Sequence, residues 1–225
     1  GGTTNFTTQE TVGSLTINAG GLLALNGAAG TTHSTGTFTM AGGATPTGTL
    51  DLGSNHLVIN YSGASPLATI ESEVISGFHN GDFNGPGIRS SSASFSGAHP
   101  TAVGYAEASA VGLTSGFNGV ATDADTILLR FTSAGDADLN GTVDTDDFTR
   151  LGQNFNAAGA LWSQGDFNYD GTVNALDVNL LATNFGQTMP AEPALGALVP
   201  EPTTLALCTV AIVALPRRRT SRRRN

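Results

Sequence analysis

The residues of this chain best suited to chemistry are two runs of oxygen-bearing side chains that lie thirty residues apart. The first run is Asp136, Asp138, Asn140, Thr142, Asp144 and Asp147, and the second is Asp166, Asn168, Asp170, Thr172, Asn174 and Asp177. Each run fills positions 1, 3, 5, 7, 9 and 12 of a loop. Alternating side-chain oxygens, with a backbone carbonyl at position 7, are the ligands that wrap a hard cation such as calcium. The sequence therefore predicts two Ca2+ sites.

The other positions of the two loops agree with this interpretation. Gly141 and Gly171 stand at position 6, where the loop turns sharply, and Val143 and Val173 at position 8 are expected to point inward and pair the loops. Position 12 is Asp in both loops rather than the usual Glu, so each loop must close more tightly or bind less strongly. The alternative, a pair of solvated Asp/Asn/Gly turns, does not account for the fixed offset of the repeat.

Each loop is followed by apolar residues at helical spacing, and together loop and helix resemble a known repeat. Gly135–Val143 and Gly165–Val173 are similar to the two repeats of a type I dockerin. The resemblance implies a loop and an exiting helix without an entering helix, and a non-catalytic module that docks onto a cohesin. Dockerins often accompany polysaccharide-degrading enzymes. Positions 10 and 11 depart from the family's Ser-Thr-like pairs, being Thr145-Asp146 and Ala175-Leu176, so the resemblance does not identify the partner.

The C-terminal segment 199–225 has a second recognisable order of features. Pro200, Glu201 and Pro202 precede an apolar run, Leu205–Leu215, and six arginines follow between Arg217 and Arg224. This order resembles a PEP-CTERM sorting signal, which implies export, transient membrane insertion and processing by an exosortase-type membrane protease. The apolar run is short against the ~20 residues that cross a bilayer. A buried core helix and an Arg-rich nucleic-acid tail are the alternatives.

Residues 1–135 predict a Gly/Thr-rich β region. Short apolar runs, such as Leu15–Ile17 and Leu57–Ile59, alternate with Gly and Asn turn formers, which favours a β-solenoid or a sandwich. One helix is expected from Ser65-Pro66 to about Gly77, and Ile127–Phe131 is expected to form a strand that leads into the first loop. The predicted fold is thus a mainly β N-terminal region with one helix, a small α calcium-binding module over 136–187, a linker over 188–198 and a C-terminal hydrophobic helix within 199–225.

No catalytic constellation is evident in the sequence. His33, His56, His79 and His99 are scattered among turn formers and are interpreted as surface residues. Glu71 and Glu73 are two residues apart on the expected helix, so they do not face each other as a glycosidase pair requires. They are interpreted as part of a solvated helix face, and the chain is predicted to lack enzymatic activity of its own.

Charge and cysteine content restrict the remaining possibilities. Before Pro200 the chain carries seventeen acidic and three basic residues, a net charge of −14, which argues against nucleic-acid binding by the body. Cys208 is the only cysteine, so no disulfide can form within the chain. Because it opens on Gly1-Gly2, we interpret the chain as a fragment or a processed form. The expected function is a non-catalytic exported protein of the cell surface, outer envelope or extracellular space with a calcium-dependent docking module. The alternative is the C-terminal part of a polysaccharide-degrading enzyme whose catalytic domain lies upstream.

Overall fold

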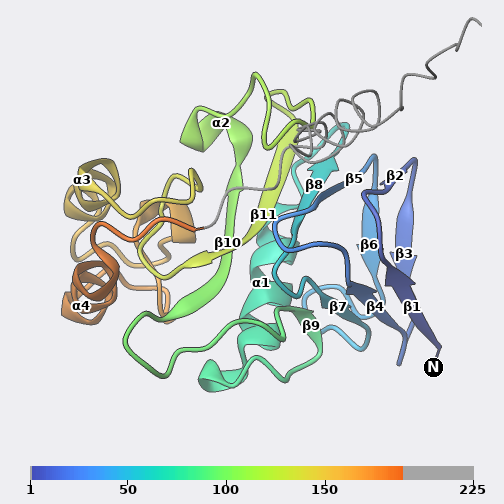
Figure 1. The fold of residues 1–225 in the computed structure, drawn as a ribbon, viewed down its shortest axis with the longest axis horizontal. Coiled ribbons are helices and arrows are strands. Elements are labelled where there is room, and N and C mark those ends of the chain that lie inside the picture. The colour runs from blue at the N-terminus through green and yellow to red at the C-terminus, as the bar shows by residue number, and fades with distance from the viewer. Residues whose placement is uncertain (1, 190–225) are drawn as a thin grey trace, which may run out of the picture. The chain divides into compact units, whose positions relative to one another are not determined.

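The computed structural model describes residues 2–189, which belong to one compact unit spanning Gly1–Glu192. Within these residues lie eleven strands and four α-helices. Both the strand-rich N-terminal part and the two predicted calcium loops are contained in this unit (Figure 1).

The first eight strands wind in successive coils that stack on one another. The first coil consists of β1 (Thr3–Phe6), β2 (Thr11–Val12) and β3 (Leu15–Ile17), the second of β4 (Leu22–Leu25), β5 (Thr32–Thr35) and β6 (Phe38–Met40), and the third of β7 (Thr49–Asp51) and β8 (His56–Asn60). Each strand pairs in parallel with its counterpart in the next coil. Leu23, Leu25 and Leu50 are buried between the ladders, because side chains of a strand alternate between its two faces.

After β8 the chain leaves the stack and forms a helix before it returns. Helix α1 (Leu67–Phe78) begins where the sequence predicted it, and the Ser65 hydroxyl accepts a hydrogen bond from the Leu67 amide. The 3-10 turn η1 (His79–Gly81) and strand β9 (Gly87–Arg89) follow, and β9 extends the parallel sheet beside β7. The predicted helix is therefore confirmed.

Two long antiparallel strands complete the larger sheet. Strands β10 (Thr101–Glu107) and β11 (Thr126–Ser133) are joined through the short helix α2 (Ala108–Val111), and β11 pairs with β8. The order of this sheet is β10-β11-β8-β5-β2, so it is parallel at one end and antiparallel at the other. The predicted strand Ile127–Phe131 is confirmed within β11.

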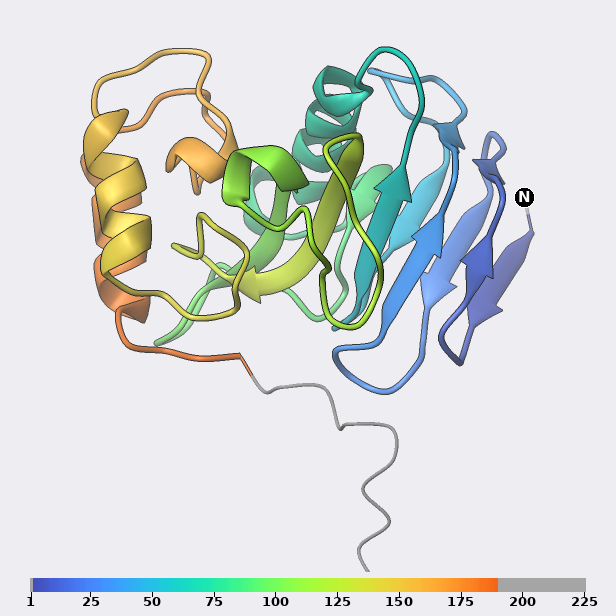
Figure 2. The same ribbon diagram turned by 90° about the horizontal axis from the view of Figure 1, so that it is seen from above.

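The loop region is built directly onto this sheet. It contributes helix α3 (Thr145–Gln153), the 3-10 turn η2 (Trp162–Gln164) and helix α4 (Ala175–Asn184). Figures 1 and 2 show α3 and α4 side by side at one end of the unit, with β1–β3 at the other. Trp162 and Leu139 are fully buried against Gly104 of β10: a Cβ atom at Gly104 would lie 2.5 Å from Leu139 Cδ2 and 2.8 Å from Trp162 Nε1.

The predicted fold class is wrong. The described residues form an α/β unit with mixed sheets, and residues 136–187 are not a separate small α module, because their aromatic side chains complete the core beside β10. The stacked N-terminal coils are likewise not a free-standing solenoid or a sandwich, since antiparallel strands and α1 continue them. None of the described helices is an apolar C-terminal helix, and the segment predicted to form one lies outside residues 2–189.

Candidate metal centre

The first loop places its predicted ligands around a common point. One carboxylate oxygen each from Asp136, Asp138 and Asp147 lies within 4.8 Å of the others. The loop is held by its own carboxylates: Asp147 Oδ1 accepts from the amides of Ala137 at 2.7 Å and Asp138 at 3.1 Å, and Oδ2 accepts from Asp144 at 2.8 Å. These bonds orient the position-12 carboxylate toward the start of the loop.

Asp136 is the deepest member of this cluster. Its side chain is 0% exposed, and its Oδ2 accepts hydrogen bonds from the Thr132 hydroxyl and from the Gly141 amide at 3.0 Å. Its Oδ1 is buried and has no hydrogen-bond partner among the described residues. Burial raises the pKa of Asp136 to about 7, although Thr132 and Arg130 partly counter this effect. A buried carboxylate oxygen without a donor costs free energy that a cation would remove.

The second loop repeats the hydrogen-bond pattern of the first. Asp177 Oδ1 accepts from the amides of Phe167 and Asn168, and its Oδ2 accepts from Asn174. Asp166 Oδ2 accepts from Gly171 as Asp136 does from Gly141. Burial raises the pKa of Asp166 to about 6 and also raises that of Asp177. The two loops therefore share one backbone geometry, which the thirty-residue repeat predicted.

The loops differ in charge and in their attachment to the sheet. The first contains four Asp and one Asn among its side-chain ligands, whereas the second contains three Asp and two Asn. In addition, Arg130 of β11 donates from Nη1 to the carbonyl of Leu139 at 2.9 Å, and Trp162 Nε1 donates to the carbonyl of Asp136 at 2.7 Å. The first loop is thus fixed by groups outside the repeat.

The second loop is anchored instead through its aromatic residue and its helix. The Tyr169 hydroxyl accepts from the Val103 amide and donates to the Val103 carbonyl of β10. At the end of α4, Asn184 donates from Nδ2 to the carbonyls of Pro100 and Ala134, each at 2.7 Å. The expectation that Val143 and Val173 point inward is confirmed, since both are fully buried. Their backbone groups do not pair the two loops with each other: those of Val143 bond to Gly186 and Gln187, and those of Val173 bond to Asn156 and Ala157.

Large apolar side chains remain exposed on the exiting helices and just after them. Phe148, Phe155, Leu176 and Phe185 are 47–58% exposed, while Leu151 and Leu181 on the inner faces are buried. The apolar stripe expected on each helix is therefore divided between a core-facing and a solvent-facing part. Thr145 and Asp146 are also exposed at the start of α3.

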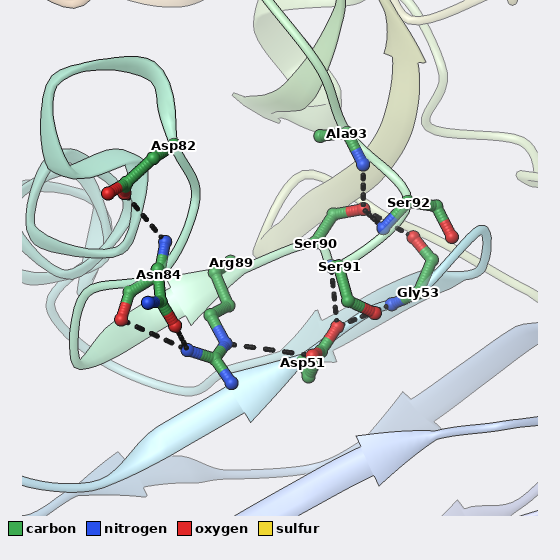
Figure 3. Close-up of polar contacts among 9 residues, drawn as sticks. All are labelled: Asp51, Gly53, Asp82, Asn84, Arg89, Ser90, Ser91, Ser92 and Ala93. Carbon is green, nitrogen blue, oxygen red and sulfur yellow. Dashed lines mark hydrogen bonds and ion pairs between the residues drawn. The ribbon is translucent and has the colours of Figure 1, made fainter.

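A second polar cluster, at the ends of β7 and β9, has a structural explanation. Figure 3 shows that Asp51 Oδ1 accepts from the amides of Gly53 and Ser91, while Arg89 Nε lies 3.6 Å from Asp51 Oδ2. The Ser90 hydroxyl donates to the carbonyl of Gly53 at 2.5 Å. These contacts hold the segment after β9 against the stack.

The sequence interpretation of the histidines and of the helix carboxylates needs correction. His33 and His56 are buried rather than exposed, and burial lowers the pKa of both. Glu73 is only 1% exposed, so it does not belong to a solvated helix face, and burial raises its pKa to about 7. His33 lies in β5 and His56 in β8, and both strands lie inside the five-stranded mixed sheet. The two histidine side chains are therefore buried, although turn formers flank them in the sequence.

Sequence reasoning missed the groups that support the first loop from outside. Arg130, Thr132 and Trp162 contact this loop but belong to no part of the ligand pattern. One signal was available: Arg130 interrupts an apolar strand directly before the loop, and a buried arginine requires acceptors. The sorting residues Pro200, Glu201 and Pro202 lie outside the described residues. Within residues 2–189, no helix is sufficiently long and apolar to cross a membrane.

Comparisons with known proteins leave this geometry as the main guide to function. No family model matches the chain, and the searches of curated proteins and of solved structures found no significant match.

Proposed function

We propose that the loops 136–147 and 166–177 bind one Ca2+ ion each and that the helices that leave them form a docking surface for another protein. The observation that carries this proposal is the buried Oδ1 of Asp136, which has no hydrogen-bond donor among the described residues and belongs to the cluster with Asp138 and Asp147. Hard oxygen ligands at this spacing suit calcium. The second loop supports the proposal by its matching hydrogen bonds.

The docking part of the proposal rests on exposed apolar residues in α3 and α4 and just after each helix. Exposed large apolar side chains in a soluble protein can mark an interaction surface. Phe148, Phe155, Leu176 and Phe185 have this property. The partner class that the dockerin resemblance suggests is a cohesin-like domain. Because the residues at positions 10 and 11 differ between the two loops, we favour a partner that contacts one loop-helix unit at a time.

We propose further that the protein is exported and acts at the cell surface or outside the cell without enzymatic activity. Support comes from the sequence of segment 199–225, whose Pro-Glu-Pro motif, apolar run and basic end suit transient membrane insertion and cleavage by an exosortase-type protease. The arginines are costly to translocate, so they would stay on the cytoplasmic side.

Isothermal titration calorimetry on the full chain, after treatment with a chelator, tests calcium binding. We expect two binding events in the wild type, one in Asp136→Ala and one in Asp166→Ala. Asp125→Ala, which removes an exposed acid directly before β11, at the end of that strand away from the first loop, is the matched control and should retain both. An absence of binding heat in the wild type at millimolar calcium would refute the proposal.

Docking is tested separately with a cohesin-type domain as the probe. Binding that requires calcium and is weakened at least tenfold by Phe148→Ala would support it. A Phe148→Ala variant that binds calcium normally and docks as well as the wild type would remove α3 from the docking surface.

A further inference from the structure

The segments that follow the two exiting helices pair with the calcium loops in a crossed manner. Residues 186–189, which follow α4, pair with residues 141–143 of the first loop. Residues 156–159, which follow α3, pair with residues 171–173 of the second loop. Each loop is therefore held by the segment that leaves the helix of the other loop. We call residues 186–189 the first clamp and residues 156–159 the second clamp.

Three backbone hydrogen bonds join the first clamp to the first loop. The Val143 amide donates to the carbonyl of Gln187 at 2.9 Å, and the Val143 carbonyl accepts from the Gly186 amide at 2.8 Å. The Met189 amide donates to the carbonyl of Gly141 at 2.7 Å. The contacts thus fall on positions 6 and 8 of the loop, on either side of the position whose backbone carbonyl is expected to bind calcium.

This pairing determines where the carbonyl of Thr142, at position 7, points. Thr142 and Thr188 lie opposite each other in an antiparallel bridge, between the hydrogen bonds that their neighbours make. Residues in such a pair direct their own N–H and C=O groups away from each other. The Thr142 amide accordingly donates to Asn140 Oδ1 inside the loop at 2.7 Å. The first clamp therefore keeps the Thr142 carbonyl on the side of the loop where its other ligands lie.

The second clamp has the same backbone geometry thirty residues earlier. The Gly159 amide donates to the carbonyl of Gly171 at 2.7 Å, and Ala158 lies opposite Thr172 in an antiparallel bridge. The sequences of the two clamps are Asn-Ala-Ala-Gly and Gly-Gln-Thr-Met, so no side chain is shared. Recurrence of one geometry with unlike side chains indicates that the clamps belong to the architecture of the loops.

The first clamp is also attached to the sheet at both of its ends. Before it, Asn184 donates to the carbonyl of Ala134 directly after β11. At its far end, the Ser133 hydroxyl donates to the sulfur of Met189 at 3.5 Å, and the half-buried Met189 side chain lines a hollow of about 90 Å³ together with Phe131. These anchors place the clamp beside the first loop independently of the ligands.

We propose that the first clamp is a positioning element of the first calcium site, and that calcium in the first loop in turn holds the clamp closed. This inference rests on the proposed calcium binding. Without the clamp, the backbone of residues 141–143 has to be ordered when the ion binds, which lowers the affinity. Because the coupling between two equilibria is reciprocal, an ion bound to the Thr142 carbonyl opposes opening of the clamp by the same factor. The first calcium site therefore secures the segment that leads into the linker 188–198.

Hydrogen exchange detected by NMR on the full chain, with chelator and with calcium, tests whether calcium holds the clamp. Exchange of the Gly186 and Met189 amides requires the clamp to open. At one hundred times the dissociation constant of the first site, calcium should slow this exchange by up to about one-hundredfold. The slowing should persist in Asp166→Ala and be lost in Asp136→Ala. Asp138→Ala, which alters a less buried ligand of the same loop, replaces Asp136→Ala if that variant does not fold.

Isothermal titration calorimetry tests whether the clamp positions the site. In a chain with Asp166→Ala, which leaves only the first site, Met189→Pro removes the N–H that bonds to the Gly141 carbonyl. It should raise the calcium dissociation constant about threefold to tenfold relative to Met189→Ala, which also shortens the side chain but keeps the N–H. In a chain with Asp136→Ala, the two substitutions at Met189 should give equal dissociation constants for the second site.

The possible results separate this inference from the proposed function. An absence of binding heat in the wild type removes both. Normal calcium binding with equal first-site dissociation constants for Met189→Pro and Met189→Ala overturns this inference alone, as does exchange of the Met189 amide that calcium leaves unchanged. Circular dichroism identifies a proline variant that fails to fold, and hydrogen exchange of the wild type then decides.

Discussion

Replacement of Asp136 by Asn separates the cost of the buried charge from the benefit of calcium. Burial raises the pKa of Asp136 from 3.8 to about 7 in the calcium-free protein. A carboxyl whose pKa is raised on folding favours the protonated form, so the folded state loses stability as the pH rises from 3.8 to about 7. At pH 8 this loss is about 4 kcal/mol from the pKa difference.

Asp136→Asn removes the charge and keeps the shape. The new amide leaves a buried N–H₂ group near the position of Oδ1, which costs about 1–3 kcal/mol if it finds no acceptor. The net expectation is a calcium-free variant that is more stable than the wild type by about 1–3 kcal/mol at pH 8. The variant should gain nothing over the wild type at pH 4, where the wild-type carboxyl is protonated in the folded state.

Asp136→Asn should reduce the stabilisation that calcium provides, although it stabilises the calcium-free protein. A ligand at one hundred times its dissociation constant stabilises the folded state by about 2.7 kcal/mol per site. Wild type should show this gain from both loops, and Asp136→Asn from the second loop alone. Urea unfolding at pH 4 and pH 8, with a chelator and with calcium, measures all four conditions. A variant that is less stable than the wild type in chelator at pH 8, yet responds fully to calcium, would refute the reasoning.

Three further predictions concern other parts of the chain. Burial raises the pKa of Glu73 to about 7, so the charged carboxylate makes the folded state lose stability as the pH rises above 4.5. In saturating calcium, Glu73→Gln should therefore stabilise the protein by up to about 3 kcal/mol at pH 8 but not at pH 4. Parallel denaturation curves at the two pH values measure the difference. Gly104→Ala should cost about 1–3 kcal/mol in thermal unfolding, since its methyl group would overlap Leu139, whereas Gly152→Ala meets no atom within 4 Å and should be neutral or stabilising. Mass spectrometry of the exported protein should find a C-terminus near the Pro-Glu-Pro motif and no residues 217–224; an intact exported chain would exclude processing.

The N-terminal stack shows why its architecture was difficult to predict. The spacing between paired strands is 19 residues from Thr3 to Leu22, 27 from Leu22 to Thr49 and 38 from Thr49 to Gly87. Turns of unequal length, and the insertion of α1 before β9, remove any fixed period. Each strand could be expected from its composition, but the order of the sheets depends on contacts between residues far apart in the chain.

The positions and internal hydrogen bonds of the two loops could be predicted from the sequence alone. Ligand types, spacing and the position-6 glycines are local properties, because the carboxylates bond to amides within the same twelve residues. For the same reason helix α1 was predictable from its cap and apolar spacing. Local hydrogen bonds of this kind need no knowledge of the remainder of the fold.

Only the tertiary structure decided what surrounds the loops. Trp162, Tyr169 and Leu139 are buried against β10, and Arg130 reaches from β11 to the carbonyl of Leu139, so the loop region is part of the larger α/β unit. Burial of this kind depends on which strand lies beneath a side chain, and that strand lies far away in the sequence. The same long-range packing buried Asp136 and left its Oδ1 without a hydrogen-bond partner among residues 2–189. A charge on this carboxylate therefore costs free energy that a bound cation would reduce.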